Sequence, residues 1–95
     1  MKKIYDISNF VDTLTSEKVI RNLAERELSR RKSMGLSRKE LSNKSLVSYA
    51  SIRRFEETGE ISLSSLLKIA DALSCLEDFE KVIQPTYIKD LKDLI

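Results

Sequence analysis

Histidine is absent from this 95-residue sequence, and cysteine occurs once, at Cys75. Without histidine, zinc sites built on imidazole and nucleophilic triads with a histidine base are excluded. A single thiol cannot form an internal disulfide and is a poor nucleophile candidate here, so we expect Cys75 to be a small core residue rather than a redox switch. Carboxylate and lysine chemistry stay formally open, but we expect no catalytic residues, metal or cofactor.

The chain is also poor in glycine, with two residues, in proline, with one, and in aromatic side chains, at 6%. This composition favours helices over strands and tight turns. No stretch approaches the roughly 20 apolar residues of a membrane span. The segment Met1–Asp6 lacks the apolar run of a secretion signal. We therefore expect one intracellular, cytoplasmic domain that does not contact a membrane.

Charge is unevenly distributed along the chain. Residues 16–55 hold eleven Lys and Arg against four Glu, whereas residues 56–95 hold four Lys against nine acidic residues. A basic middle section is typical of a surface that faces a polyanion, and an acidic second half suggests a different role for the opposite side. A merely solvated charged surface explains the charges alone equally well.

Helical periodicity recurs through most of the sequence. Apolar spacing and capping residues predict helices over about 16–33, 37–45, 48–57, 62–73 and 76–84. The fold class predicted is therefore all-α, with a tail from Pro85 whose apolar residues also have helical spacing. For residues 1–15 the sequence leaves a loose arm and a short strand open.

Apolar stripes on these helices predict the core. The first helix presents one such face, the fourth a second, and the segment before Pro85 a third; the residues are Val19, Ile20, Leu23, Ala24 and Leu28, then Leu63, Leu66, Leu67, Ala70 and Leu73, then Leu76, Phe79, Val82 and Ile83.

The second and third helices carry the most specific local signals. Ser37 and Glu40 form a capping-box pattern, and Ser48 is a good N-cap. Ile52 and Phe55 are three residues apart and share the inward face. Two short helices separated by about three residues form a helix-turn-helix.

The run from Leu36 to Leu73 resembles the helix-turn-helix domain of phage repressors and XRE-type regulators. The matching residues are Leu36-Ser37, Glu40-Leu41-Ser42, Val47-Ser48, Ser51-Ile52, Arg54-Phe55-Glu56, Leu63, Leu66-Leu67, Ile69-Ala70 and Ala72-Leu73. The resemblance implies a lambda-repressor-like bundle of about five helices. Together with the expected helices, it suggests an arm (1–15), a DNA-binding domain (16–84) and a tail (85–95).

The same resemblance implies a buried pair between Arg31 and Glu56. It also shows a departure, because the family often has a small residue, usually glycine, where this chain has Leu46. If that position needs a positive φ, then Leu46 is strained or the turn is built differently.

Carried over by position, the resemblance implies a set of DNA contacts. Tyr49, Ala50 and Arg54 are expected to face base edges in the major groove, where Arg54 would pair with guanine. Ser48, Ser51 and Arg53 are candidates for phosphate or mixed contacts. Arg38, at the start of a helix, is expected to bind a phosphate. For Tyr49, Arg53 and Arg54 the alternative is an ordinary exposed helix residue.

A narrower stretch, Arg54–Leu63, resembles antitoxins that bind HipA-type kinase toxins. This implies an autoregulatory repressor that binds a palindromic operator in double-stranded DNA as a homodimer and also binds a toxin protein. The dimer surface is expected in the fifth segment and the tail. Alternatives are a stand-alone phage-type repressor and a helical protein–protein adaptor that does not bind DNA.

Overall fold

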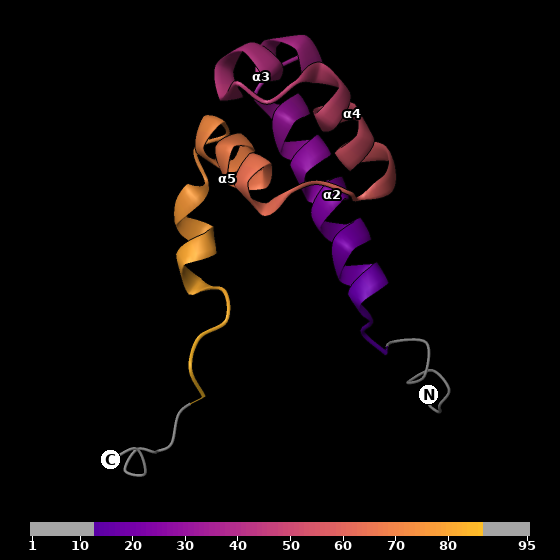
Figure 1. Cartoon of the computed structure of the whole chain (residues 1–95), viewed down its shortest axis with the longest axis vertical. Helices are drawn as coiled ribbons and strands as arrows, with labels where there is room; N and C mark the ends of the chain where they lie inside the picture. Colours follow the sequence, from indigo (N-terminus) through magenta and orange to yellow (C-terminus); the bar gives the residue numbers. More distant parts are fainter. Residues whose placement is uncertain (1–12, 87–95) are drawn as a thin grey trace.

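The structure is a computed structural model and describes residues 13–86 (Figure 1). The elements are α2 (Ser16–Ser33), α3 (Arg38–Ser45), α4 (Tyr49–Thr58), α5 (Leu63–Ala72) and the 3-10 helix η1 (Leu76–Lys81). The predicted all-α class is confirmed, since residues 13–86 contain helices and no strand. Most of the expected arm and tail lies outside the described residues, and the domain boundaries stay predictions.

The long helix α2 is the element on which the rest of the domain is assembled. Its C-terminal half lies against α4, α4 packs on α3, and α3 packs on α5 (Figure 1). From α5 the chain continues into η1, so η1 and the N-terminal half of α2 form two diverging legs below the body of the domain. Neither α2 nor any other helix between residues 13 and 86 is long and apolar enough to cross a membrane.

Each α-helix begins at a hydroxyl side chain. Thr15, Ser37, Ser48 and Ser62 each accept a hydrogen bond from the backbone N–H three residues later, at 3.0 to 3.1 Å. The capping box of α3 is confirmed, because the backbone N–H of Ser37 also donates to Glu40 at 2.8 Å. These caps satisfy N–H groups that have no partner within the helix, which explains why the sequence located the helix starts correctly.

The core consists of two clusters. One contains Leu41, Val47, Ile52, Ile69, Ala72 and Leu73. The other contains Ala24, Phe55 and Leu66. Ile52 and Phe55, as predicted, are almost completely buried, and they anchor α4 in both clusters at once.

Several residues assigned to the core from periodicity are exposed, and those assignments were wrong. Val19 and Ile20 are 44% and 43% exposed, and Leu63 is 67% exposed. Leu76, Val82 and Ile83 are 40%, 56% and 94% exposed. Periodicity gives the face of a helix but not how far its neighbours extend. These residues lie on the N-terminal half of α2, at the first position of α5 and on the leg formed by η1, where coverage by the body of the domain ends.

Cys75 is partly buried against the first cluster, in keeping with the expected core role. Burial raises the pKa of its thiol, which disfavours the reactive thiolate.

Candidate nucleic-acid interface

A tight turn joins α3 to α4. The turn begins at Leu46, whose φ of 66° and ψ of 19° lie in the left-handed region. The hydroxyl of Ser42 donates to the carbonyl of Val47 at 2.6 Å, and the backbone N–H of Val47 donates to the hydroxyl of Ser45 at 3.1 Å. The position therefore does need a positive φ. Leu46 adopts it with its side chain 85% exposed, so the turn is built as the resemblance implied, at the cost of strain.

Helix α4 presents a free face opposite its buried one. Tyr49 is 48% exposed, and Ala50, Arg53 and Arg54 are exposed as well. These side chains border a shallow depression of about 260 Å³ that Glu57 and Thr58 complete. The outward placement of Tyr49, Ala50 and Arg54 agrees with the sequence-based expectation, and their contacts with bases stay predictions.

Both arginines on this face bind neighbouring carboxylates. Arg53 Nε lies 3.1 Å from a Glu57 oxygen one turn later, and Arg54 is paired with Glu60 beyond the end of the helix. All four side chains are at least half exposed. Exposed ion pairs of this kind contribute about 0–1 kcal/mol, so exchanging either carboxylate for a phosphate or a base edge has a small energetic cost.

The serines at the start of α4 are occupied in capping. The hydroxyl of Ser48 accepts from the backbone N–H of Ser51 and donates to the Ser51 hydroxyl at 2.9 Å. Ser48 is exposed and Ser51 half-buried. Their position at a helix N-terminus, where backbone N–H groups and the helix dipole favour an anion, is compatible with a phosphate contact.

Arg38 is held differently from the expectation of a free phosphate ligand. Its Nε donates to Oε1 of Glu56 at 2.9 Å, and its side chain is only 27% exposed. That hydrogen bond is the main cause that raises the pKa of Arg38. The structure thus places Arg38 in a network with Glu56, and its side chain also interacts with Tyr49 at the start of α4.

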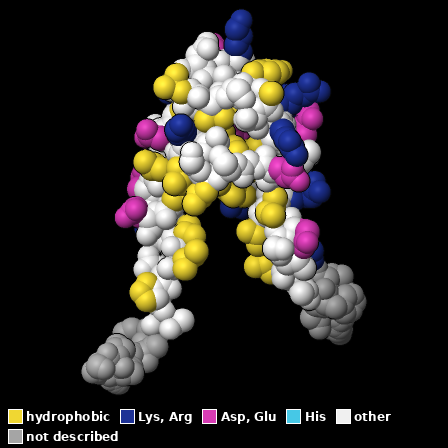
Figure 2. Space-filling model, viewed as in Figure 1, with side chains coloured by type: hydrophobic (Ala, Val, Ile, Leu, Met, Phe, Trp, Pro, Cys, Tyr) yellow, Lys and Arg dark blue, Asp and Glu magenta, His cyan; other side chains and the backbone are white. Residues whose placement is uncertain are grey.

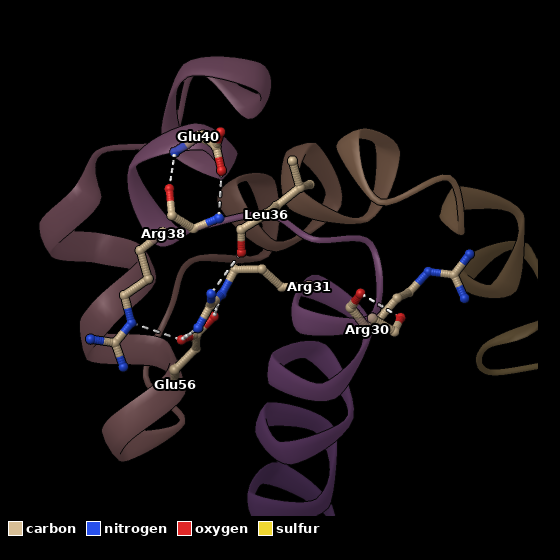
Figure 3. A network of polar contacts seen from close by, with 8 residues as sticks. Arg30, Arg31, Leu36, Arg38, Glu40 and Glu56 are labelled. Carbon is tan, nitrogen blue, oxygen red and sulfur yellow. Dashed lines mark hydrogen bonds and ion pairs between the residues drawn. The ribbon is translucent and has the colours of Figure 1, made fainter.

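The Arg31–Glu56 pair implied by the resemblance is confirmed (Figure 3). Arg31 donates through Nε and Nη2 to the two oxygens of Glu56, each at 2.8 Å, and through Nη1 to the carbonyl of Leu36 at 2.9 Å. For Glu56, burial alone would raise the pKa, but the interactions with Arg31, Glu27 and Arg38 outweigh it and lower the pKa to about 2. The carboxylate of Glu56 is the point where α2, α3 and α4 meet.

Two further polar residues were missed from the sequence. Glu27 is buried because it lies on the same face of α2 as the buried residues Ala24 and Arg31. Its helical spacing from these two residues could have revealed the burial. For Arg30 the sequence suggested no structural role, yet its guanidinium donates to the carbonyls of Leu73 and Ser74 at 2.7 and 3.2 Å. Arg30 thereby satisfies the carbonyls at the C-terminal end of α5 and ties that end to α2.

A groove of about 950 Å³ lies between α2, α5 and η1, on the side of α2 away from α4. Its apolar lining includes Val19, Leu23, Leu66, Phe79 and Val82. Figure 2 shows hydrophobic side chains along the facing sides of the two legs. Over residues 13–86 there is no group of three or more acidic or Cys side chains that could hold a metal ion.

Comparison with known families supplies one match. The model of the family HTH_3, described as Helix-turn-helix, matches residues 28–79, which is more than half of the chain. The match covers the last third of α2, the whole of α3, α4 and α5, and most of η1. No curated protein and no solved structure gives a significant match.

Proposed function

This chain belongs to the HTH_3 family of XRE-type helix-turn-helix domains, which bind DNA, and from this premise we propose that it is an autoregulatory repressor that serves as the antitoxin of a toxin–antitoxin pair. The observation that carries the DNA-binding part is the geometry of α4. Ile52 and Phe55 fix one side in the core, and the opposite side offers Tyr49, Ala50 and Arg54 to a partner.

The proposed reading mechanism follows from that geometry. Helix α4 enters the major groove, which is about 12 Å wide. Arg54 leaves Glu60 and pairs with O6 and N7 of a guanine, Ala50 contacts a thymine methyl, and Tyr49 contacts a base or a phosphate.

Phosphates on either side of the groove fix the register. Ser48, Ser51 and Arg53 hold one backbone segment, and Arg38 offers its Nη groups to another at the start of α3. Because Arg38 also binds Glu56, its phosphate contact would be coupled to the position of α4.

Repression by such a small domain requires two copies. Two recognition helices about 34–36 Å apart read the two halves of a palindromic operator. We place the contact between the copies on the leg formed by η1, where Leu76, Val82 and Ile83 are exposed, and on the apolar groove beside it. Ile83→Glu should then yield a monomer in sedimentation equilibrium, and Lys81→Glu, an exposed neighbour, should leave the dimer intact.

The antitoxin part rests on the resemblance of Arg54–Leu63 to antitoxins of HipA-type kinases and on the acidic second half of the chain, which has nine acidic residues against four Lys. A basic surface of a toxin protein would complement that half. Co-expression with the product of the adjacent reading frame, followed by purification of the complex, tests this part separately from DNA binding.

A mobility-shift assay with the chain's own upstream DNA, repeated over a series of salt concentrations, tests the proposed DNA binding. We expect a shift that weakens steeply as salt rises, because bound phosphates release counterions. Arg38→Ala should weaken binding to all sequences alike and reduce the salt dependence. Arg21→Ala is the matched control, since Arg21 is exposed on α2 and borders neither the groove nor the free face of α4.

A second candidate function is a protein–protein adaptor. The apolar groove of about 950 Å³ favours it, because a peptide helix could bury its apolar face there. An absent or salt-insensitive shift in the same assay would support the adaptor and contradict the repressor.

A further inference from the structure

The carboxyl group of Glu27 is buried in an environment that disfavours its ionised form. It lies on α2 with 7% of its surface exposed, and both carboxyl oxygens are buried without a hydrogen-bond donor among the described residues. An ionised carboxylate in such a place loses its hydration and receives no donor in return, which costs several kcal/mol.

The charged and titratable groups around Glu27 come from four parts of the chain. They are Arg31 on α2, Arg38 on α3, Glu56 on α4 and Cys75 just before η1. Arg31 directs its hydrogen bonds to Glu56 and to the carbonyl of Leu36, and Arg38 directs its bond to Glu56. The two guanidinium groups therefore attract Glu27 only at a distance, while their donors serve Glu56.

Glu27 lies one turn before Arg31 on the buried stripe of α2, and Arg31 donates to both oxygens of Glu56. The Glu27 and Glu56 carboxyl groups therefore lie close together around Arg31 and interact with each other. Two carboxylates at such a separation repel each other. One proton removes the repulsion and turns an oxygen of one group into a donor for the other, giving a short charge-assisted bond. Because Arg31 and Arg38 stabilise the charge of Glu56, the proton belongs on Glu27.

We propose that Glu27 is a positioning residue which carries a proton at neutral pH and donates it to Glu56, thereby completing the network that holds α4 on α2. Burial, followed by the interaction with Glu56, raises the pKa of Glu27 to about 8, and the pKa of Glu56 is lowered to about 2.

The protonated Glu27 makes the attachment of α4 sensitive to pH. The folded chain holds this proton between the usual carboxyl pKa and about 8, whereas the unfolded chain releases it. The folding equilibrium constant should therefore fall by up to about tenfold for each pH unit within that interval. The effect on DNA affinity rests on the proposed function; the effect on folding does not.

The experiment is a pH titration of the full chain by two readouts. The first is the ¹³C chemical shift of the Glu side-chain carboxyls, in which we expect the Glu27 carboxyl to titrate near pH 8. The second is the folding equilibrium constant from urea unfolding at pH 5 to 9, for the wild type, Glu27→Gln and Glu25→Gln. Gln keeps a donor for Glu56 but has no proton to lose, so the decline with pH should vanish in Glu27→Gln alone.

The proposal is overturned if the Glu27 carboxyl titrates near its ordinary value, or if Glu27→Gln shows the same decline as the wild type. The carboxyl titration decides the matter even if Glu27→Gln does not fold. Neither readout involves DNA. If Glu27 proves to be protonated but the chain does not bind its operator, the proposed function is contradicted and the Glu27 proposal is not. Where operator binding is present, Glu27→Gln should retain it to higher pH than the wild type.

Discussion

Arg31 and Glu56 are joined by two parallel hydrogen bonds, each 2.8 Å long, that connect the last turn of α2 to α4. The Glu56 side chain is fully buried, and Arg31 also holds the carbonyl of Leu36 before α3 begins. The pair therefore fixes three elements relative to one another. The pair lies on the inner side of α4, opposite the face proposed to read DNA, and fixes the position of that face.

Breaking this pair from one side should destabilise the fold strongly. In Arg31→Met, Glu56 keeps only Arg38 as a cationic partner and is left as a poorly compensated buried charge. We expect a loss of about 3–5 kcal/mol in the free energy of unfolding, measured by urea denaturation. Arg53→Ala, which breaks an exposed pair with Glu57, is the control and should cost no more than about 1 kcal/mol. Equal effects of the two substitutions would show that the buried pair has no special role.

Leu46→Gly should stabilise the protein. Leu46 has a φ of 66°, and its side chain is 85% exposed, so glycine removes the strain and gives up little burial. Relief of about 1–2 kcal/mol is partly offset by the greater entropy of glycine in the unfolded chain. Thermal denaturation should show a higher Tm, whereas Lys68→Gly, at an exposed position in the middle of α5, should lower it. A lower Tm for Leu46→Gly would mean that the exposed leucine has a packing partner, such as a second copy.

The two glycines allow the cost of backbone strain to be measured separately from the cost of a steric clash. Gly35 and Gly59 both have positive φ, at 72° and 84°. A Cβ at Gly35 would meet nothing within 4 Å, whereas one at Gly59 would lie 2.2 Å from Cγ2 of Ile20. Gly35→Ala should therefore cost about 1–2 kcal/mol from backbone strain alone. Gly59→Ala should cost more in the same unfolding assay, and similar losses would contradict the close packing of Gly59 on α2.

Glu56 should make the protein sensitive to acid. Its pKa in the folded state is about 2, below that of an unfolded glutamate, so the folded state binds fewer protons than the unfolded state between these values. Its contribution is complete above the unfolded pKa and is lost as pH falls toward 2. Urea unfolding of wild type at decreasing pH should show this decline. Glu56→Gln should lower the free energy of unfolding at neutral pH and make it depend less on pH in the acidic range. An unchanged pH dependence in that range would assign the acid sensitivity to other carboxyls.

The local elements of this fold could be predicted because short-range chemistry determines them. Ser37 with Glu40 marks the start of α3, and Ser48 marks the start of α4. The three-residue spacing of Ile52 and Phe55 gives the buried face of α4. The resemblance also supplied the Arg31–Glu56 pair, which no periodicity would have indicated.

The exposure of several apolar residues could not be predicted, because it depends on how far each helix extends past its neighbours. Val19 and Val82 have the same apolar character as core residues, and only the diverging paths of α2 and η1 leave them exposed. Glu27 was overlooked because a charged residue is normally assigned to the surface. Its proposed partner Glu56 lies 29 positions away in the sequence and approaches it only in the folded structure.

Operator affinity of Arg54→Ala, measured by fluorescence anisotropy at one fixed salt concentration against the operator and against operators with single base changes, tests the central proposal most directly. The proposed docking of α4 predicts a loss of about 1–3 kcal/mol in binding free energy and a relaxed preference at one base pair. Unchanged affinity and unchanged preference would show that the exposed face of α4 does not read DNA.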